Sequence, residues 1–316
     1  MTQKVLSYDL GGTKVAVGVI TDQGVILESV RQPVLLEKGK EAVLDQLTQL
    51  GVYYLERHPD IDRIGIASAG PLNPQTGELL DPTNFSSPQG GRWGRVPLAP
   101  ILQQRLNRAV ILDNDAAAAV LAEHWIGAAR GIKNVMVLTL GTGLGTGIIC
   151  NGHLVRSGRS LHPEAGHLIL NLEDQSAPCG CGNWGCAEAY LSGKNFENRM
   201  KLQFQDESLT NLELSRRART GDPAALRAFS NYAYILSVAI HNYIRIYAPE
   251  VILFSGSFSK TQDLFLPETR THLEKLLKRL RSEPDLLPEL KLAQLDNDAG
   301  LIGGAYLALH SERLLQ

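Results

Sequence analysis

Three cysteines lie within eight residues of one another in a glycine-rich stretch. Cys179, Cys181 and Cys186 follow the pattern C-x-C-x4-C. Thiolates at this spacing can share one tetrahedral ion, and zinc is the usual occupant of such sites. A fourth ligand is needed; His167 is the nearest histidine on the N-terminal side and His162 is the alternative. A closed site has no open coordination position, so we expect a structural role.

Two glutamates flank this cluster. Glu164 stands three residues before His167, and Glu188 stands two residues after Cys186. An ion that holds both segments would also hold both carboxylates, which can accept hydrogen bonds from the vicinal hydroxyls of a sugar. The alternative is that both are solvated surface residues.

An Asp-Asn-Asp triplet precedes a run of alanines at 113–119. It can cap a helix, because Asn and Asp accept from the first free N–H groups. It can also supply a carboxylate that takes the proton of a hydroxyl during phosphoryl transfer. A second copy spans 296–298, where capping alone suffices. The pattern does not decide which copy would act as the base.

Two glycine-rich loops each lie between two expected strands, at 9–14 and 141–147. Glycines let backbone N–H groups converge without side chains in the way, which is a geometry that cradles phosphate. Hairpin turns are the alternative for either loop alone. Neither loop is a Walker-type P-loop. The presence of two loops favours a bound nucleotide.

The hydrophobic pattern places these residues on alternating strands and helices. Strands are expected at 5–10, 14–20, 25–30, 64–70, 135–140, 147–150 and 251–254, helices at 41–55, from 115, at 222–249 and at 261–281, a strand-helix pair at 290–312, and a long functional loop at 71–100. The glycine loop and the Asp-Asn-Asp triplet recur in the same order, which indicates an internal duplication. Two such α/β halves normally bind ligand in the cleft between them.

Composition excludes several classes of function. The 316 residues include 31 Lys and Arg against 33 Asp and Glu, a net charge of −2, so no basic patch for nucleic acid or a membrane surface is expected. No apolar run approaches the roughly 18 residues of a membrane span. The N-terminus does not resemble a signal peptide, and we expect a cytoplasmic protein.

Together these segments resemble the ROK family of bacterial sugar kinases, within the actin-like, hexokinase-like ATPase superfamily. The resemblance runs from residue 4 to about residue 310. Its most specific part is the cysteine cluster with Glu-x-Gly-His upstream. The segments that carry it are Asp9-Leu-Gly-Gly-Thr-Lys14, Asp113-Asn-Asp-Ala116, Gly141-Thr-Gly-Leu-Gly-Thr-Gly147, Glu164-Ala-Gly-His167 and Cys179-Gly-Cys-Gly-Asn-Trp-Gly-Cys-Ala-Glu188.

The resemblance implies roles for individual residues. Asp115 would deprotonate the sugar 6-hydroxyl for in-line attack on the γ-phosphoryl group of ATP. His167 would be the fourth zinc ligand, beside Cys179, Cys181 and Cys186. The implied sugar contacts are Gly70, Asn84, Asn114, Asp115, Glu164, His167 and Glu188. The implied nucleotide contacts are Asp9, Gly11, Gly12, Thr13, Lys14, Thr142, Gly143 and Gly256. The implied cofactors are ATP, Mg²⁺ and a structural Zn²⁺, and a homodimer is usual.

The implied fold is two actin-like (ribonuclease H-like) α/β domains around a central cleft. We expect an N-terminal domain at 1–115, on which a helix near 299–312 packs, and a C-terminal domain at 116–316 with the zinc-loop insertion at about 160–205. One departure is Ser255-Gly256-Ser257, where the family usually has three glycines against the adenosine. This leaves nucleotide preference open.

The resemblance implies a hexokinase, with glucose as the leading substrate. The alternatives are N-acetylglucosamine, N-acetylmannosamine and fructose kinases. A non-catalytic sugar sensor is a remote alternative, since Asp115 and both phosphate loops are present. The family's transcriptional repressors carry a helix-turn-helix domain before the first strand. In this sequence the first strand is expected to begin by about residue 4, so we do not expect a repressor.

Overall fold

The chain divides into two α/β units. The structure is a computed structural model that describes residues 2–82, 85, 91–159, 161–278 and 286–314. The first unit takes the residues up to Arg130, Leu154–Pro163 and those from Asn297 onward; the second takes Gly131–His153 and Glu164–Asp296.

The first unit is built on a five-stranded sheet with the order β3-β2-β1-β4-β8. Its strands are β1 (Lys4–Leu10), β2 (Lys14–Thr21), β3 (Ile26–Pro33), β4 (Arg63–Ser68) and β8 (Ala109–Asn114). The hairpins β1-β2 and β2-β3 are antiparallel, whereas β1, β4 and β8 are parallel. The carboxyl ends of these three strands therefore meet at one edge of the sheet.

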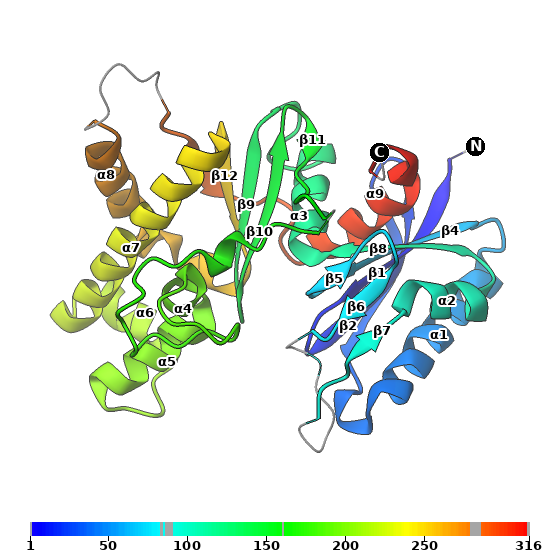
Figure 1. Ribbon diagram of the computed structural model, residues 1–316, viewed down its shortest axis with the longest axis horizontal. Helices are drawn as coiled ribbons and strands as arrows, with labels where there is room; N and C mark the ends of the chain where they lie inside the picture. The colour runs from blue at the N-terminus through cyan, green and yellow to red at the C-terminus, as the bar shows by residue number, and fades with distance from the viewer. Residues whose placement is uncertain (1, 83–84, 86–90, 160, 279–285, 315–316) are drawn as a thin grey trace. The chain divides into compact units, whose positions relative to one another are not determined.

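Helices cover both faces of this sheet. Successive side chains of β1 point to opposite faces: the Ser7 hydroxyl donates to Leu301 O in α9 (Ala299–Leu314), and the Tyr8 hydroxyl donates to Leu47 O in α1 (Lys40–Arg57). On the α9 face, α9 also packs against α3 (Asp115–Trp125), and on the α1 face α1 packs against α2 (Leu98–Leu106). Figure 1 shows α9, at the red end of the chain, beside the blue strands of this sheet.

The described part of segment 71–100 contains more structure than the sequence predicts. Three short strands form a second sheet in the order β5-β6-β7: β5 (Leu72–Asn73), β6 (Glu78–Leu80) and β7 (Arg95–Val96). Strand β8 and helix α2 were also not expected. The peptide bond from Gly70 to Pro71 is cis. The prediction of one long loop is therefore wrong, because strands of two or three residues leave too short a pattern to detect.

The second unit repeats the strand order of the first. Its sheet runs β11-β10-β9-β12-β13, with β11 (His153–Leu154), β10 (Leu144–Cys150), β9 (Val135–Leu140), β12 (Val251–Ser255) and β13 (Glu289–Leu292). Strands β9 and β10 are antiparallel, whereas β12 runs parallel to both β9 and β13. The two sheets thus share one topology, as an internal duplication predicts.

The helices of the second unit pack around a long central one. Helix α7 (Pro223–Tyr247) begins after Asp222, whose side chain accepts from Ala224 N and Ala225 N, and it packs against α8 (Leu266–Leu277). The remaining elements are η2 (Ala165–His167), α4 (Ala187–Leu191), α5 (Gly193–Phe204), α6 (Asn211–Arg219) and η3 (Ser257–Leu264). The helix expected at 261–281 is divided, with η3 ending before Phe265.

The division into units differs from the boundary that the sequence predicts at residue 115. Helix α3 stays with the first unit because it packs against α9, and the chain crosses to the second unit only after Arg130. Segment 154–163 also belongs to the first unit, although the sequence assigns it to the second. Among the described helices, none combines the length and apolar character that crossing a membrane requires.

Candidate functional site

In the first unit, the predicted catalytic and phosphate-binding segments meet at one edge of the sheet. Leu10 lies opposite Ser68, and Ser68 lies opposite Asn114, so the ends of β1, β4 and β8 are level. Neighbouring strands are about 4.8 Å apart. The first glycine loop, the segment that leads to Gly70, and the Asn114–Asp115 turn are therefore adjacent. Ligands of α/β sheets bind at such carboxyl edges.

The turn at Asp115 is held by its neighbour. The Asn114 side-chain oxygen accepts from Ala116 N at 2.8 Å and from Ala117 N at 3.2 Å, which caps α3. Asp115 is the first residue of the helix, and its Oδ1 accepts from Ala116 N at 2.8 Å. Its side chain is partly open to solvent. Capping is thus done by Asn114, and the Asp115 carboxylate can also serve a ligand.

The second Asp-Asn-Asp copy is arranged differently. The carboxylate of Asp298 binds the guanidinium of Arg31, which also donates to Asn297 O at 2.9 Å. The first copy instead lies at the start of the 11-residue helix α3, with Asn114 as its N-cap, whereas the second forms the short 3-10 helix η4 (Asp296–Asp298).

The first glycine loop is a tight turn between β1 and β2. Gly11 N donates to Lys14 O at 3.0 Å, and Thr13 and Lys14 are exposed. Asp9 lies one residue before the end of β1, beside the start of α9: a Cβ on Gly300 would stand 2.3 Å from its carboxyl carbon. Burial raises the pKa of Asp9 to about 6, and the charge of Arg31 opposes this rise.

The second glycine loop is tied to Glu188. Gly141 N donates to Gly143 O at 3.1 Å, which closes the turn, and Thr142 is exposed at its tip. Leu144 N then donates to Glu188 Oε2 at 2.9 Å. A Cβ on Gly143 would stand 2.7 Å from that same oxygen. A residue predicted to bind sugar therefore supports the loop predicted to bind phosphate, a link that sequence spacing does not reveal.

The segment Glu164–His167 packs against the same loop. A Cβ on Gly166 would stand 2.1 Å from the backbone oxygen of Leu144, so only glycine fits there. Ala165 N donates to Thr146 Oγ1 at 3.3 Å, and the Tyr243 hydroxyl of α7 donates to Ala165 O at 3.1 Å. These contacts set the position of Glu164 and His167 relative to the second glycine loop.

The three cysteines and His167 converge to form a candidate metal centre. Their ligand atoms all lie within 4.8 Å of one another. The Cys181 and Cys186 sulfurs are 3.7 Å apart, and Cys179 Sγ is 3.4 Å from His167 Nδ1. A tetrahedral zinc with Zn–S bonds of about 2.3 Å requires separations of about 3.8 Å between sulfurs and about 3.6 Å between sulfur and nitrogen. The four residues fit that ion.

His162, the alternative ligand, lies elsewhere. It belongs to the first unit and is buried beside Asp113 and Arg156, where burial lowers its pKa to about 4. The group of four ligands contains His167 and does not contain His162.

Backbone pairing also holds the two glutamates. Leu170 N donates to Gly185 O at 2.7 Å, and Ala187 N donates to Leu168 O at 2.9 Å, so the segments that lead from His167 and to Glu188 run side by side. Loss of hydration raises the pKa of Glu164, and the negative charge of Glu188 adds to this rise while His167 opposes it. The two carboxylates and the imidazole are thus electrostatic neighbours.

Gly256 lies at the corresponding edge of the second sheet. Ser255 pairs with Thr139, so Gly256 stands level with the end of β9. Its φ is 86°, and a Cβ there would stand 2.5 Å from Leu140 O, so both conformation and space demand glycine. Gly256 has this conformation with Ser255 and Ser257 on either side of it.

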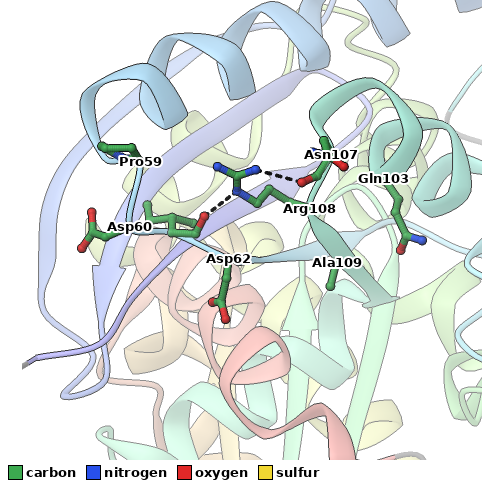
Figure 2. Close-up of a pocket in the computed structure, with 8 residues that line it drawn as sticks. Pro59, Asp60, Asp62, Gln103, Asn107, Arg108 and Ala109 are labelled. Carbon is green, nitrogen blue, oxygen red and sulfur yellow. Dashed lines mark hydrogen bonds between the residues drawn. The ribbon is translucent and has the colours of Figure 1, made fainter.

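Two features fall outside this arrangement. The predicted contact Asn84 lies outside the described residues. A surface pocket of about 510 Å³ lies at the opposite end of β4 and β8, near Ile61 and Ala109. Figure 2 shows Arg108 within it, donating to Ile61 O at 2.6 Å and Asn107 O at 2.8 Å. Six residues of β8 span about 17 Å, so this pocket is remote from Asp115.

Comparisons with known proteins agree with these features. A family model described as "ROK family" matches residues 5–311. The glucokinase of Thermotoga maritima is 31% identical over 315 residues, which cover 96% of each chain. An N-acetyl-D-glucosamine kinase of Yersinia pseudotuberculosis is 28% identical over 96% of this chain and 98% of its own. A solved ROK family glucokinase from Streptomyces griseus, in complex with glucose and AMPPNP, has a TM-score of 0.81 and 28% identity over 98% of this chain and 100% of its own.

Proposed function

Because this chain belongs to the ROK family, we propose that it is an ATP-dependent hexokinase that transfers the γ-phosphoryl group of ATP to the 6-hydroxyl of glucose. The 31% identity with a glucokinase over nearly the full length of both chains supports this activity. The observation that carries the proposal is the clustering of the Glu164–His167 segment, Glu188 and the second glycine loop on one another. Sugar-binding and phosphate-binding chemistry thus share one scaffold.

Asp115 is the proposed general base. Its carboxylate would accept the proton of the 6-hydroxyl as the oxygen attacks the γ-phosphorus in line with the leaving ADP. Asn114 caps α3 at 2.8 Å from Ala116 N and so holds the carboxylate in a defined direction. Orientation contributes much of the rate in phosphoryl transfer, because the transition state is loose and little covalent chemistry is left to the protein.

Glu164, His167 and Glu188 are the proposed acceptors for sugar hydroxyls. His167 offers Nδ1 to the cysteine cluster, at 3.4 Å from Cys179 Sγ, which leaves Nε2 for a hydroxyl. Glu188 uses Oε2 for Leu144 N. Asn114 and Gly70 are the proposed contacts from the first unit.

The nucleotide is proposed to bind through the glycine loops. Backbone N–H groups in Gly11–Lys14 and at Thr142 and Gly143 would contact phosphate oxygens, and Gly256 would lie against the adenosine. A magnesium ion bound to ATP would offset the charge that develops on the transferring group. Asp9, whose pKa is about 6, is ionised at neutral pH and suits a position near that cation.

The four-ligand cluster is proposed to hold a structural zinc ion. Burial raises the pKa of the Cys186 thiol, and a bound zinc ion would stabilise its thiolate. Zinc would then join the segments that carry Glu164 and Glu188. An ATP-consuming reaction and four unbridged cysteines favour the cytoplasm, and a homodimer is the proposed assembly.

N-acetylhexosamine phosphorylation is the second candidate, because the Yersinia kinase aligns over nearly the whole chain. Fructose remains an alternative within the same family resemblance. The segment 71–97 is the proposed determinant at the sugar C2 position.

An ADP-release assay with Mg-ATP tests the proposal. The sugars are glucose, N-acetylglucosamine, N-acetylmannosamine, mannose and fructose. We expect glucose to give the highest kcat/KM. A higher kcat/KM for an N-acetylhexosamine would assign the second candidate, and no turnover on any sugar by folded, zinc-loaded protein would refute the kinase assignment.

A further inference from the structure

Arg156 makes a two-pronged ion pair with a buried carboxylate next to the proposed base. Its Nη1 donates to Asp113 Oδ1 at 2.8 Å, and its Nη2 donates to Asp113 Oδ2. The Asp113 side chain is 2% exposed and that of Arg156 is 18% exposed. Parallel bonds of this kind fix the plane of a carboxylate as well as its charge.

The same carboxylate holds the backbone of the catalytic turn. Asp113 Oδ1 also accepts from Asn114 N at 2.7 Å. Asn114 in turn caps α3, and Asp115 is the first residue of that helix. One continuous set of bonds therefore runs from the Arg156 guanidinium through Asp113 and Asn114 to the residue that would take the proton.

The surroundings of the Asp113 carboxylate make it depend on the positive charge of Arg156. His162 is buried beside it and neutral above about pH 4, so it supplies no positive charge. Without Arg156, Asp113 would be a buried carboxylate that has lost its guanidinium partner. Such a carboxylate must take up a proton or move toward water. Either change would weaken or displace its bond to Asn114 N.

We propose that Arg156 is a positioning residue for phosphoryl transfer, which holds Asp113 in place and thereby fixes the direction of Asp115. The inference rests on the proposed function for its catalytic consequence. Arg156 lies eight residues before Glu164 in the chain. A single segment thus carries the support for the base and then continues into a proposed sugar contact.

The second Asp-Asn-Asp copy shows that this pairing is not a general need of the motif. There the arginine, Arg31, binds the third residue, Asp298, and not the first. The first residue, Asp296, pairs with Lys260 at 3.2 Å, and both are largely exposed. Only the copy that contains the proposed base has its first carboxylate buried under an arginine.

The test uses Arg156→Met, Arg156→Lys and a matched control, Arg219→Met. Arg219 makes the same two-pronged bond to Asp263, at 2.8 and 2.9 Å, but both side chains are about half exposed. We expect Arg156→Met to lower kcat about 100-fold, the order of loss that a misplacement of about 1 Å causes. KM for ATP should change less than threefold, and KM for sugar should change much less than kcat. Arg156→Lys should recover part of kcat, and Arg219→Met should retain native kcat.

Two double variants separate positioning from stability. The first double variant combines Asp113→Asn with Arg156→Met, and the second combines Asp113→Leu with Arg156→Met, so both remove the buried charges. The first keeps a side-chain oxygen that can accept from Asn114 N, whereas the second does not. Removal of both partners of a buried pair is often tolerated. We expect both to fold, and the leucine variant to be at least tenfold slower than the asparagine variant. Equal rates in the two would overturn the inference.

Amide hydrogen exchange provides a readout that does not depend on activity. In Arg156→Met, exchange of the amides of Asn114, Ala116 and Ala117 should accelerate at least tenfold, and it should stay native in Arg219→Met. Unchanged protection would overturn the inference, even if the enzyme is a kinase. A native protein inactive on every sugar would refute the proposed function, and the exchange result would still decide whether Arg156 holds the turn.

Discussion

Replacement of Asp115 by asparagine removes a charge while leaving the turn around it intact. Asp115→Asn keeps an oxygen that can accept from Ala116 N, a bond of 2.8 Å in the native chain. Asn114 continues to cap α3 through its own side chain. The substitution removes a negative charge from the first turn of a helix, which contributes about 0.3–1 kcal/mol. We therefore expect the free energy of unfolding to fall by about 1 kcal/mol.

The loss of activity should be much larger than the loss of stability. Removal of a general base typically lowers the rate 10²–10⁴-fold. That range corresponds to about 2.7–5.5 kcal/mol of transition-state stabilisation. Because the proposed role of Asp115 is to accept the proton that leaves during transfer, the loss should appear in kcat, with KM for glucose changed less than about tenfold. Unfolding cannot account for such a difference.

The assay measures ADP release with Mg-ATP and glucose, and thermal unfolding is followed on the same preparations. Asp298→Asn is the matched control, because it makes the same substitution at the same position of the second Asp-Asn-Asp copy, where Arg31 binds the carboxylate. We expect this control to keep at least a third of the native kcat. The assignment of Asp115 fails if Asp115→Asn keeps more than a tenth of native kcat, or if Asp298→Asn loses as much.

Three further predictions concern the metal, the phosphate loop and pH. Cys181→Ser should lose bound zinc and bind glucose more weakly, whereas Cys150→Ser should keep one zinc per chain. Metal analysis measures the zinc content, and calorimetry measures the glucose affinity. Native glucose affinity in zinc-free protein would contradict the expectation. In Gly143→Ala the added Cβ would stand 2.7 Å from Glu188 Oε2, so this variant should raise KM for both ATP and sugar at least tenfold. In Gly141→Ala the added Cβ meets nothing within 4 Å, so KM should rise much less. Equal effects in the two variants would remove the steric argument. Burial lowers the pKa of His162 to about 4, so between about pH 6.5 and 4 the unfolded chain binds a proton that the folded chain does not, and the free energy of unfolding should fall by up to about 3 kcal/mol over that range. Urea unfolding of His162→Leu should therefore show a flatter pH dependence than that of the native protein. An identical slope in both would refute His162 as the cause.

Local sequence patterns are sufficient to predict the main strands, the two glycine loops and the three cysteines of the candidate metal centre. Strand periodicity and glycine punctuation depend on neighbouring residues, so β1, β2 and β9 were predicted within one residue of their observed ends. The cysteine cluster can be predicted because its three cysteines lie within eight residues of one another. The duplication was visible because the same motifs recur in the same order, and the shared strand order confirms it.

The sequence could not show which distant segments would touch. Arg156 and Asp113 are 43 residues apart, and Leu144 and Glu188 are 44 apart, so no local period connects them. The same limit explains the domain boundary, because α3 stays in the first unit through its packing on α9, far along the chain. Local conformation depends on neighbouring residues and can be predicted from sequence. The support of the proposed base depends on close contact between distant segments, which only folding brings about.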